Sequence, residues 1–206
     1  MSSEPSSIVL PDGYADVPAG KIAAVVTYLE MSKPPRRGAR RNRAVGLELA
    51  AIGSDPERYL ALFRRVGEPW LWFSRLVMPE AELRDILASP DVDTLALRRG
   101  GEDIGLLELD FRRPDECELA FLGVVPEAIG TGAGRFLVET AAKRAFARPL
   151  RRFWVHTCSF DHPSAVDFYR RAGFAPYRRA VEIADDPRLS GLLARSAAPH
   201  VPMIER

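Results

Sequence analysis

The segment FLGVVPEAIGTGAGRFLVETAAKRAF, residues Phe121–Phe146, decides how this chain folds. It opens with a β-branched apolar run that ends at Pro126, which is typical of a strand. Three glycines follow in alternation, Gly130, Gly132 and Gly134, and apolar residues then recur at helical spacing. The segment therefore predicts a strand, a glycine-rich turn and a helix in direct succession.

The glycine turn is suited to binding an anion. Glycines leave successive backbone N–H groups uncovered, and the helix that follows has no obvious residue to cap its first amides. Such a helix start is a ready site for a pyrophosphate. A Walker loop is excluded, because the turn ends in Gly134-Arg135-Phe136 and lacks the required Gly-Lys-Ser/Thr. A Rossmann turn is excluded by the G-x-G-x-G spacing and by a next strand that ends in His-Thr-Cys-Ser.

The rest of the chain predicts an α/β protein with a single domain over residues 1–206. Strands are expected at 22–31, 92–99, 102–111, 117–125, 151–160 and 174–183, and helices at 54–67, 78–89, 133–147 and 162–173. The connection through the glycine turn is a βαβ crossover, so the strands that flank it should be parallel. Residues 1–20 and 185–206 are expected to form irregular arms.

Composition excludes several classes of protein. The 29 basic and 28 acidic residues nearly balance, which gives no global argument for nucleic acid or an anionic membrane. The basic segment 34–43 contains no aromatic residue for base stacking, so a solvated loop is favoured over a nucleic-acid site. Two cysteines without metal-ligand spacing predict neither a disulfide framework nor a structural metal. The start lacks the pattern of a signal peptide and no apolar run is long enough to span a membrane, so a cytoplasmic location is expected.

Two motifs together resemble the GCN5-related N-acetyltransferase (GNAT) superfamily. The first is Pro126–Arg135, which is similar to the acetyl-CoA loop of that family. The second is DHPSAVDFYRRAGF, residues Asp161–Phe174, which is similar to a later helix of the family. The match covers roughly 94–182. It implies a mixed central sheet, with an antiparallel meander and a parallel βαβ pair that splays at the cofactor site, flanked by helices.

The resemblance implies acetyl-CoA as cosubstrate, with its pantetheine arm along the strand that ends at Val125 and its pyrophosphate on the glycine turn. Cofactor-binding residues are expected at Leu122, Gly123, Val124, Gly130, Thr131, Gly132, Ala133, Gly134, Arg135 and His162. Two residues depart from the family pattern. Ile129 stands where Gln or Arg is usual, and His162 stands where Asn is usual. Arg135 is a substitute source of positive charge for a phosphate.

The resemblance also assigns candidate catalytic residues. Tyr169 matches the tyrosine that protonates the departing thiolate. The alternative is a core aromatic pair, in which the spacing favours Phe168 as the buried member. Glu118 is a candidate general base, directly or through water; the alternative is a solvated carboxylate. His156 and Glu108 are further candidates for the base, and Thr157 occupies a position where some relatives carry Glu.

Three functions follow. The first is N-acetylation of a primary amine on a small molecule or protein, and the second is non-catalytic acyl-CoA binding on the same fold. The third is nucleic-acid binding through Arg36–Arg43. Homodimerisation is an option that is independent of these three functions. The aromatic stretch Trp70, Trp72 and Phe73 is expected either to line the acceptor pocket or to form core and dimer contacts.

Overall fold

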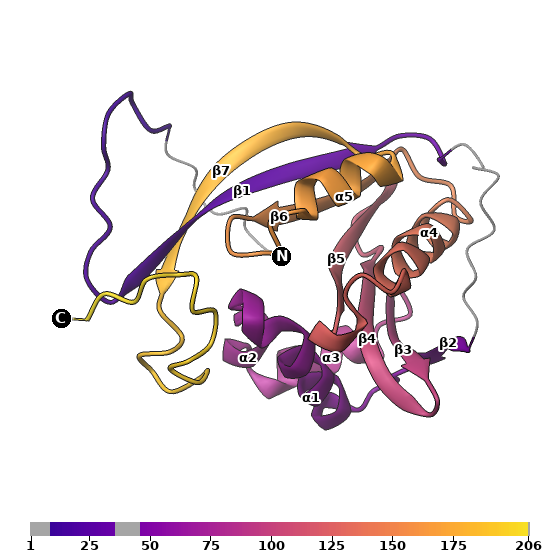
Figure 1. Ribbon diagram of the computed structural model, residues 1–206. Coiled ribbons are helices and arrows are strands. Elements are labelled where there is room, and N and C mark those ends of the chain that lie inside the picture. The colour runs from indigo at the N-terminus through magenta and orange to yellow at the C-terminus, as the bar shows by residue number, and fades with distance from the viewer. Residues whose placement is uncertain (1–8, 36–45, 206) are drawn as a thin grey trace.

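The computed structural model describes residues 9–35 and 46–205 (Figure 1). These residues form a seven-stranded sheet in the order β2-β3-β4-β5-β6-β1-β7. The strands are β1 (Lys21–Met31), β2 (Leu47–Ala51), β3 (Val92–Arg99), β4 (Glu102–Asp110), β5 (Glu116–Val124), β6 (Arg152–Cys158) and β7 (Ala175–Asp185). The α-helices are α1 (Pro56–Gly67), α2 (Ser74–Val77), α3 (Glu80–Ala88), α4 (Ala133–Ala145) and α5 (Ala165–Ala172). Residues Glu68–Trp70 and Pro126–Ala128 form single 3₁₀ turns.

The expected sheet is confirmed. β3, β4 and β5 form an antiparallel meander, and β5 pairs with β6 in parallel across the glycine turn and α4. Both α1 and α4 pack on β4 and β5, and therefore cover opposite faces of the sheet. Figure 1 shows α1, α2 and α3 grouped together, away from α4 and α5. The structure is thus a mixed α/β sheet with helices on both sides.

Local sequence explains where the helices begin and end. The Asp55 side chain accepts a hydrogen bond from the Arg58 amide at 3.0 Å, which caps the start of α1 as its Ser-Asp-Pro-Glu sequence predicted. Gly173 ends α5 with a positive φ of 107°, a conformation that glycine adopts without steric cost. The buried face of α4 includes Leu137, Val138 and Ala141, while Phe136 and Thr140 are half-buried.

Two features of the sheet were not predicted from the sequence. β2 is a short edge strand that pairs with β3, and its five residues are too few for a periodic signal. The predicted first strand does exist, but it lies between β6 and β7 and is antiparallel to both (Figure 1). Its burial largely alternates, with Ala24 and Val26 buried and Val25 exposed between them, so one face of β1 packs in the core and the other is partly open.

Residues 186–205 contain no helix or strand but pack closely on the sheet. Asp186 and Arg188 are buried and form an ion pair at 2.7 Å. Arg188 also donates to carbonyl oxygens of the same segment, including Val201 at 2.9 Å. Residues 1–8 and the basic segment 36–45 lie outside the described residues. No helix among those described is long and apolar enough to cross a membrane.

Candidate active site

A wedge opens between β5 and β6. Their parallel pairing covers only Glu116–Glu118 against Arg152–Trp154 and stops there. A β-bulge follows at once, since Leu119 and Phe121 pair with successive residues of β4 and Ala120 is the extra residue. Bulges bend a strand and increase its twist, which accounts for the divergence of β5 from β6. The splayed pair that the family resemblance implied is therefore present.

The wedge leads into a cavity of about 650 Å³ that collects most of the predicted site residues. Those that line it are Glu118, Leu122, Gly123, Val124, Gly130, Gly132, Gly134, Arg135, His162 and Tyr169. Two predicted residues do not line it. Ala133 is fully buried at the first position of α4, and the exposed Thr131 donates its hydroxyl to the Ala128 carbonyl at 2.8 Å.

The glycine turn has the geometry of an anion site. Gly130 and Gly132 have φ values of 78° and 90°, in the left-handed region that favours glycine. Gly132 is the N-cap of α4 and supplies no side chain to its first amides, which lie at the positive end of a 13-residue helix. Gly132, Gly134 and Arg135 line the cavity, so this helix start borders it. Gly134 is different, because an added Cβ would meet Phe168 at an ordinary 3.8 Å. The backbone conformation of the turn therefore requires glycine at Gly130 and Gly132 but not at Gly134.

The residues that depart from the family pattern lie at the rim of this cavity. Ile129 is exposed there. Arg135 forms an ion pair with Glu139 at 2.7 Å, one turn further along α4. His162 is held by Ser164, whose hydroxyl lies 2.8 Å from Nδ1, and its ring packs edge-on against Trp70. The charge of Arg135 is thus at the turn but is shared with a carboxylate.

Tyr169 lies deep in the cavity, and here one expectation was wrong. Phe168 was expected to be the buried member of the pair, yet Phe168 is half-buried while Tyr169 is only 7% exposed. The Tyr169 ring packs edge-on against Phe168 and Phe174. In the part of the chain that the structure describes, its hydroxyl has no hydrogen-bond partner. Burial and the charge of Asp161 raise the pKa of Tyr169 well above its usual value, so the hydroxyl keeps its proton.

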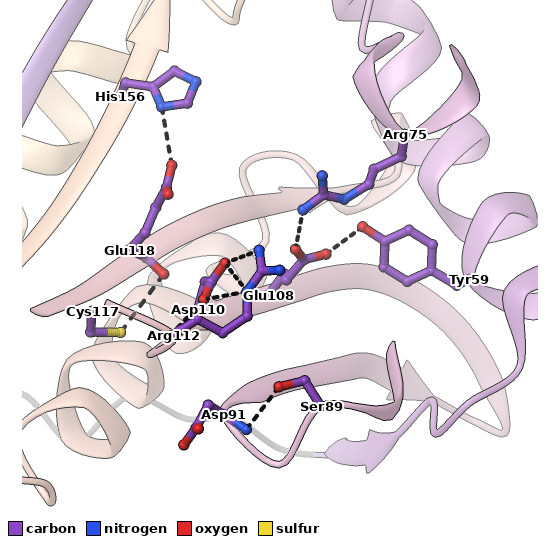
Figure 2. A network of polar contacts seen from close by, with 10 residues as sticks. All are labelled: Tyr59, Arg75, Ser89, Asp91, Glu108, Asp110, Arg112, Cys117, Glu118 and His156. Atoms are coloured by element: carbon purple, nitrogen blue, oxygen red, sulfur yellow. Dashed lines mark hydrogen bonds and ion pairs between the residues drawn. The ribbon is translucent and has the colours of Figure 1, made fainter. Parts of the chain in front are cut away.

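Glu118 of β5 and His156 of β6 face each other (Figure 2). His156 Nδ1 lies 3.5 Å from Glu118 Oε1, and both side chains are partly exposed. Burial by itself lowers the pKa of His156, but the hydrogen bond to Glu118 and nearby carboxylates raise it above its usual value. Thr157 is buried on the other face of β6, as strand alternation predicted.

Glu108 does not reach the cavity. Its side chain is 0% exposed and accepts hydrogen bonds from the Tyr59 hydroxyl and from Arg75, the latter at 2.6 Å (Figure 2). Burial and the charge of Glu108 raise the pKa of Tyr59, which therefore acts as a donor. This carboxylate is a buried structural anchor between β4 and the helices and is not available as a base.

Trp72 connects the two sides of the wedge, a role that the sequence did not indicate. Its indole packs so closely on Gly67 and Gly123 that an added Cβ would lie 2.6 Å and 3.0 Å from it, respectively. The indole N–H donates to Asp161 at 3.1 Å, and Asp161 also accepts from the Thr157 hydroxyl at 2.7 Å. Gly67, Gly123 and Asp161, which make room for Trp72 and bind it, are far apart in the sequence. Their relation to Trp72 is visible only in the folded structure.

The sequence allowed two roles for the aromatic stretch, lining a pocket or packing in the core, and the structure shows side chains that do both. Trp70, Trp72 and Phe73 all line the cavity and all are half-buried. Trp70 also packs against His200 of the C-terminal segment. The segment 186–205 therefore supports this wall of the cavity from behind.

The bulged strand, the uncapped glycine turn and the wedge define the fold of the GCN5-related N-acetyltransferases. The profile of the Acetyltransferase (GNAT) family matches residues 59–174, and the chain belongs to this family. None of the curated proteins matches the chain.

Solved structures agree with this fold. A GCN5-related N-acetyltransferase from Kribbella flavida is 18% identical with a TM-score of 0.51, over 84% of this chain and 63% of that protein. One from Sphaerobacter thermophilus is 16% identical with a TM-score of 0.53, over 92% and 55%. An aminoglycoside acetyltransferase from an uncultured soil sample is 15% identical with a TM-score of 0.52, over 64% and 90%. The chain thus spans less than two thirds of several similar proteins.

Proposed function

We propose that this protein transfers an acetyl group from acetyl-CoA to a primary amine of a small molecule or protein. The observation that carries the proposal is the uncapped start of α4 beside a wedge that leads to the buried, protonated Tyr169. The unpaired cysteines Cys117 and Cys158 suit a reducing compartment, and we propose a cytoplasmic location.

The described residues fit the cofactor. The first amides of α4 and the positive φ angles of Gly130 and Gly132 present a cradle for a pyrophosphate. Beyond Glu118, the edge of β5 that faces β6 has no strand partner, so backbone groups of Leu122–Val124 are free to pair with the amides of a pantetheine arm. Acetyl-CoA would supply the thioester that the amine attacks.

The chemistry needs one base and one acid. Glu118, directly or through a water molecule, would take the proton from the acceptor ammonium. The free amine then attacks the thioester carbonyl; a C–N bond forms, the C–S bond breaks, the sulfur leaves as a thiolate, and the nitrogen releases its extra proton to solvent. Tyr169 would give its hydroxyl proton to that sulfur and regain one from solvent. Its place in the cavity supports this role, and its raised pKa keeps the hydroxyl protonated until the thiolate forms. Holding both substrates in one cavity supplies much of the rate through proximity.

The test is release of CoA thiol with a panel of amines, with mass spectrometry of the products. Tyr169→Phe should lower kcat by about 100-fold or more, in the range for loss of a general acid, and leave CoA affinity unchanged. Tyr14→Phe is the control, because Tyr14 is fully exposed. Acetyl transfer that is unaffected by Tyr169→Phe would refute the role of Tyr169. Tight CoA binding without transfer to any amine would select the non-catalytic alternative.

A further inference from the structure

One end of the cavity carries negative charge without matching positive charge. Glu118, Asp161 and Glu182 all line the cavity. The charge of each acts on the His156 ring, which Glu118 contacts at 3.5 Å, so the three carboxylates influence a common part of the cavity. Asp161 accepts hydrogen bonds only from neutral donors, among them the Trp72 indole. In the described part of the chain, the exposed side chain of Glu182 has neither a hydrogen bond nor an ion pair.

The arginines that line the cavity are already engaged by other carboxylates. Their partners lie at 2.6 Å for Arg75–Glu108, 2.6 Å for Arg112–Asp110 and 2.7 Å for Arg135–Glu139. Within each of these pairs the positive and negative charges cancel. In the described residues, His156 is the only titratable base that contacts Glu118. Even when His156 is protonated, this end of the cavity keeps an excess of about two negative charges.

Cations on the neighbouring sheet face do not balance this excess. Arg152 pairs with Glu116 at 3.3 Å. The guanidinium of Arg178 lies over the Tyr28 ring, 4.9 Å from its centre, and neither arginine lines the cavity. The excess negative charge of Glu118, Asp161 and Glu182 is therefore left for a ligand to balance.

A second, independent observation marks this cavity as a ligand site. The Tyr169 side chain is more than nine-tenths buried, lines the same cavity, and its hydroxyl has no partner among the described residues. The hydroxyl oxygen is not sealed from solvent, so it opens into the cavity, where a ligand can hydrogen-bond to it. The half-buried Trp70 and Phe73 add apolar walls, which suit the methylene groups of a short chain.

We propose that the acceptor is a dicationic amine, with a second positive charge a few methylene groups from the nitrogen that reacts. The reacting nitrogen must lose its proton to attack, so its own charge cannot balance the cavity. The second charge remains and is held by Glu182 together with Asp161. This inference rests on the proposed function and names its acceptor class.

The test compares 1,4-diaminobutane, n-butylamine and 4-aminobutanoate as acceptors, which differ mainly in the charge at the far end. The readout is kcat/KM from CoA thiol release, in the wild type and in Glu182→Gln. The preference for diaminobutane over butylamine should fall about 5-fold or more in the variant, the effect of one charge pair near 4 Å in a solvated site. The intrinsic basicity of each amine cancels, because the same substrate pair is compared in two proteins. In the wild type, 4-aminobutanoate should be the poorest acceptor.

Glu80→Gln is the matched control, since Glu80 is an exposed glutamate on α3, and it should keep the wild-type preference. An equal diamine preference in wild type and Glu182→Gln, with transfer intact, would overturn the dicationic acceptor and leave the acetyltransferase proposal standing. Absence of transfer to all three amines and to the wider amine panel would overturn both.

Discussion

The buried pair of Glu108 and Arg75 gives the sharpest prediction about stability. Glu108 is 0% exposed and the Arg75 side chain is 12% exposed, and their contact at 2.6 Å ties β4 to α2. Removing one member of such a pair leaves a buried charge without a counter-charge, which typically costs about 3–5 kcal/mol. Arg75→Met should therefore lower the free energy of unfolding by that amount.

The double variant separates this effect from simple loss of packing. In Arg75→Met/Glu108→Gln no charge remains, and the Gln oxygen still accepts from the Tyr59 hydroxyl. We expect the double variant to lie within about 2 kcal/mol of the wild type, because replacing both members of a buried pair is often nearly neutral. The coupling free energy between the two positions should then exceed about 1 kcal/mol.

The assay is urea unfolding followed by circular dichroism, with all variants at one pH. The control is Arg84→Met, which breaks the exposed pair between Arg84 and Glu80, and it should change stability by less than about 1 kcal/mol. The reasoning fails if Arg75→Met costs no more than Arg84→Met. It also fails if the double variant is destabilised, relative to the wild type, by the full sum of the effects of Arg75→Met alone and Glu108→Gln alone.

Two further predictions concern the wedge. Gly123→Ala should destabilise the protein by about 1–3 kcal/mol, because the new methyl would lie 2.4 Å from Val66 and 3.0 Å from Trp72. Gly134→Ala meets only ordinary contact and should not destabilise it. Thermal unfolding measures both variants, and equal effects would contradict the packing. Glu118→Gln should lower the pKa of His156 in an NMR titration, since Glu118 raises it; the pair therefore stabilises the fold below the usual histidine pKa and loses this contribution as pH rises through the folded value. An unchanged His156 titration would refute that coupling.

The sequence predicted those parts of the fold that depend on local patterns. The glycine turn, the three-stranded meander and the crossover to β6 follow from periodicity and turn chemistry, and they were confirmed. The place of β1 between β6 and β7 was not predictable, because an apolar run does not reveal its neighbours. The edge strand β2 was missed for another reason: its five residues are too few to show a periodic pattern.

The site was predictable where a motif fixes it and not where contacts do. Most of the residues named from the two motifs line one cavity. Helical spacing misjudged Phe168 and Tyr169, because α5 turns its Tyr169 face toward the sheet through contacts with Phe174. The bridge from Trp72 to Asp161 joins residues 89 positions apart, which no local pattern encodes.

The central claim is that the glycine turn at the start of α4 binds the CoA pyrophosphate. The most direct test is isothermal titration of CoA into the wild type, Gly132→Glu and Gly53→Glu. Gly53 is the matched control, since it also has a positive φ, 71°, but does not line the cavity. We predict that the wild type and Gly53→Glu bind CoA and that folded Gly132→Glu does not. CoA affinity that is unchanged in Gly132→Glu would contradict the claim.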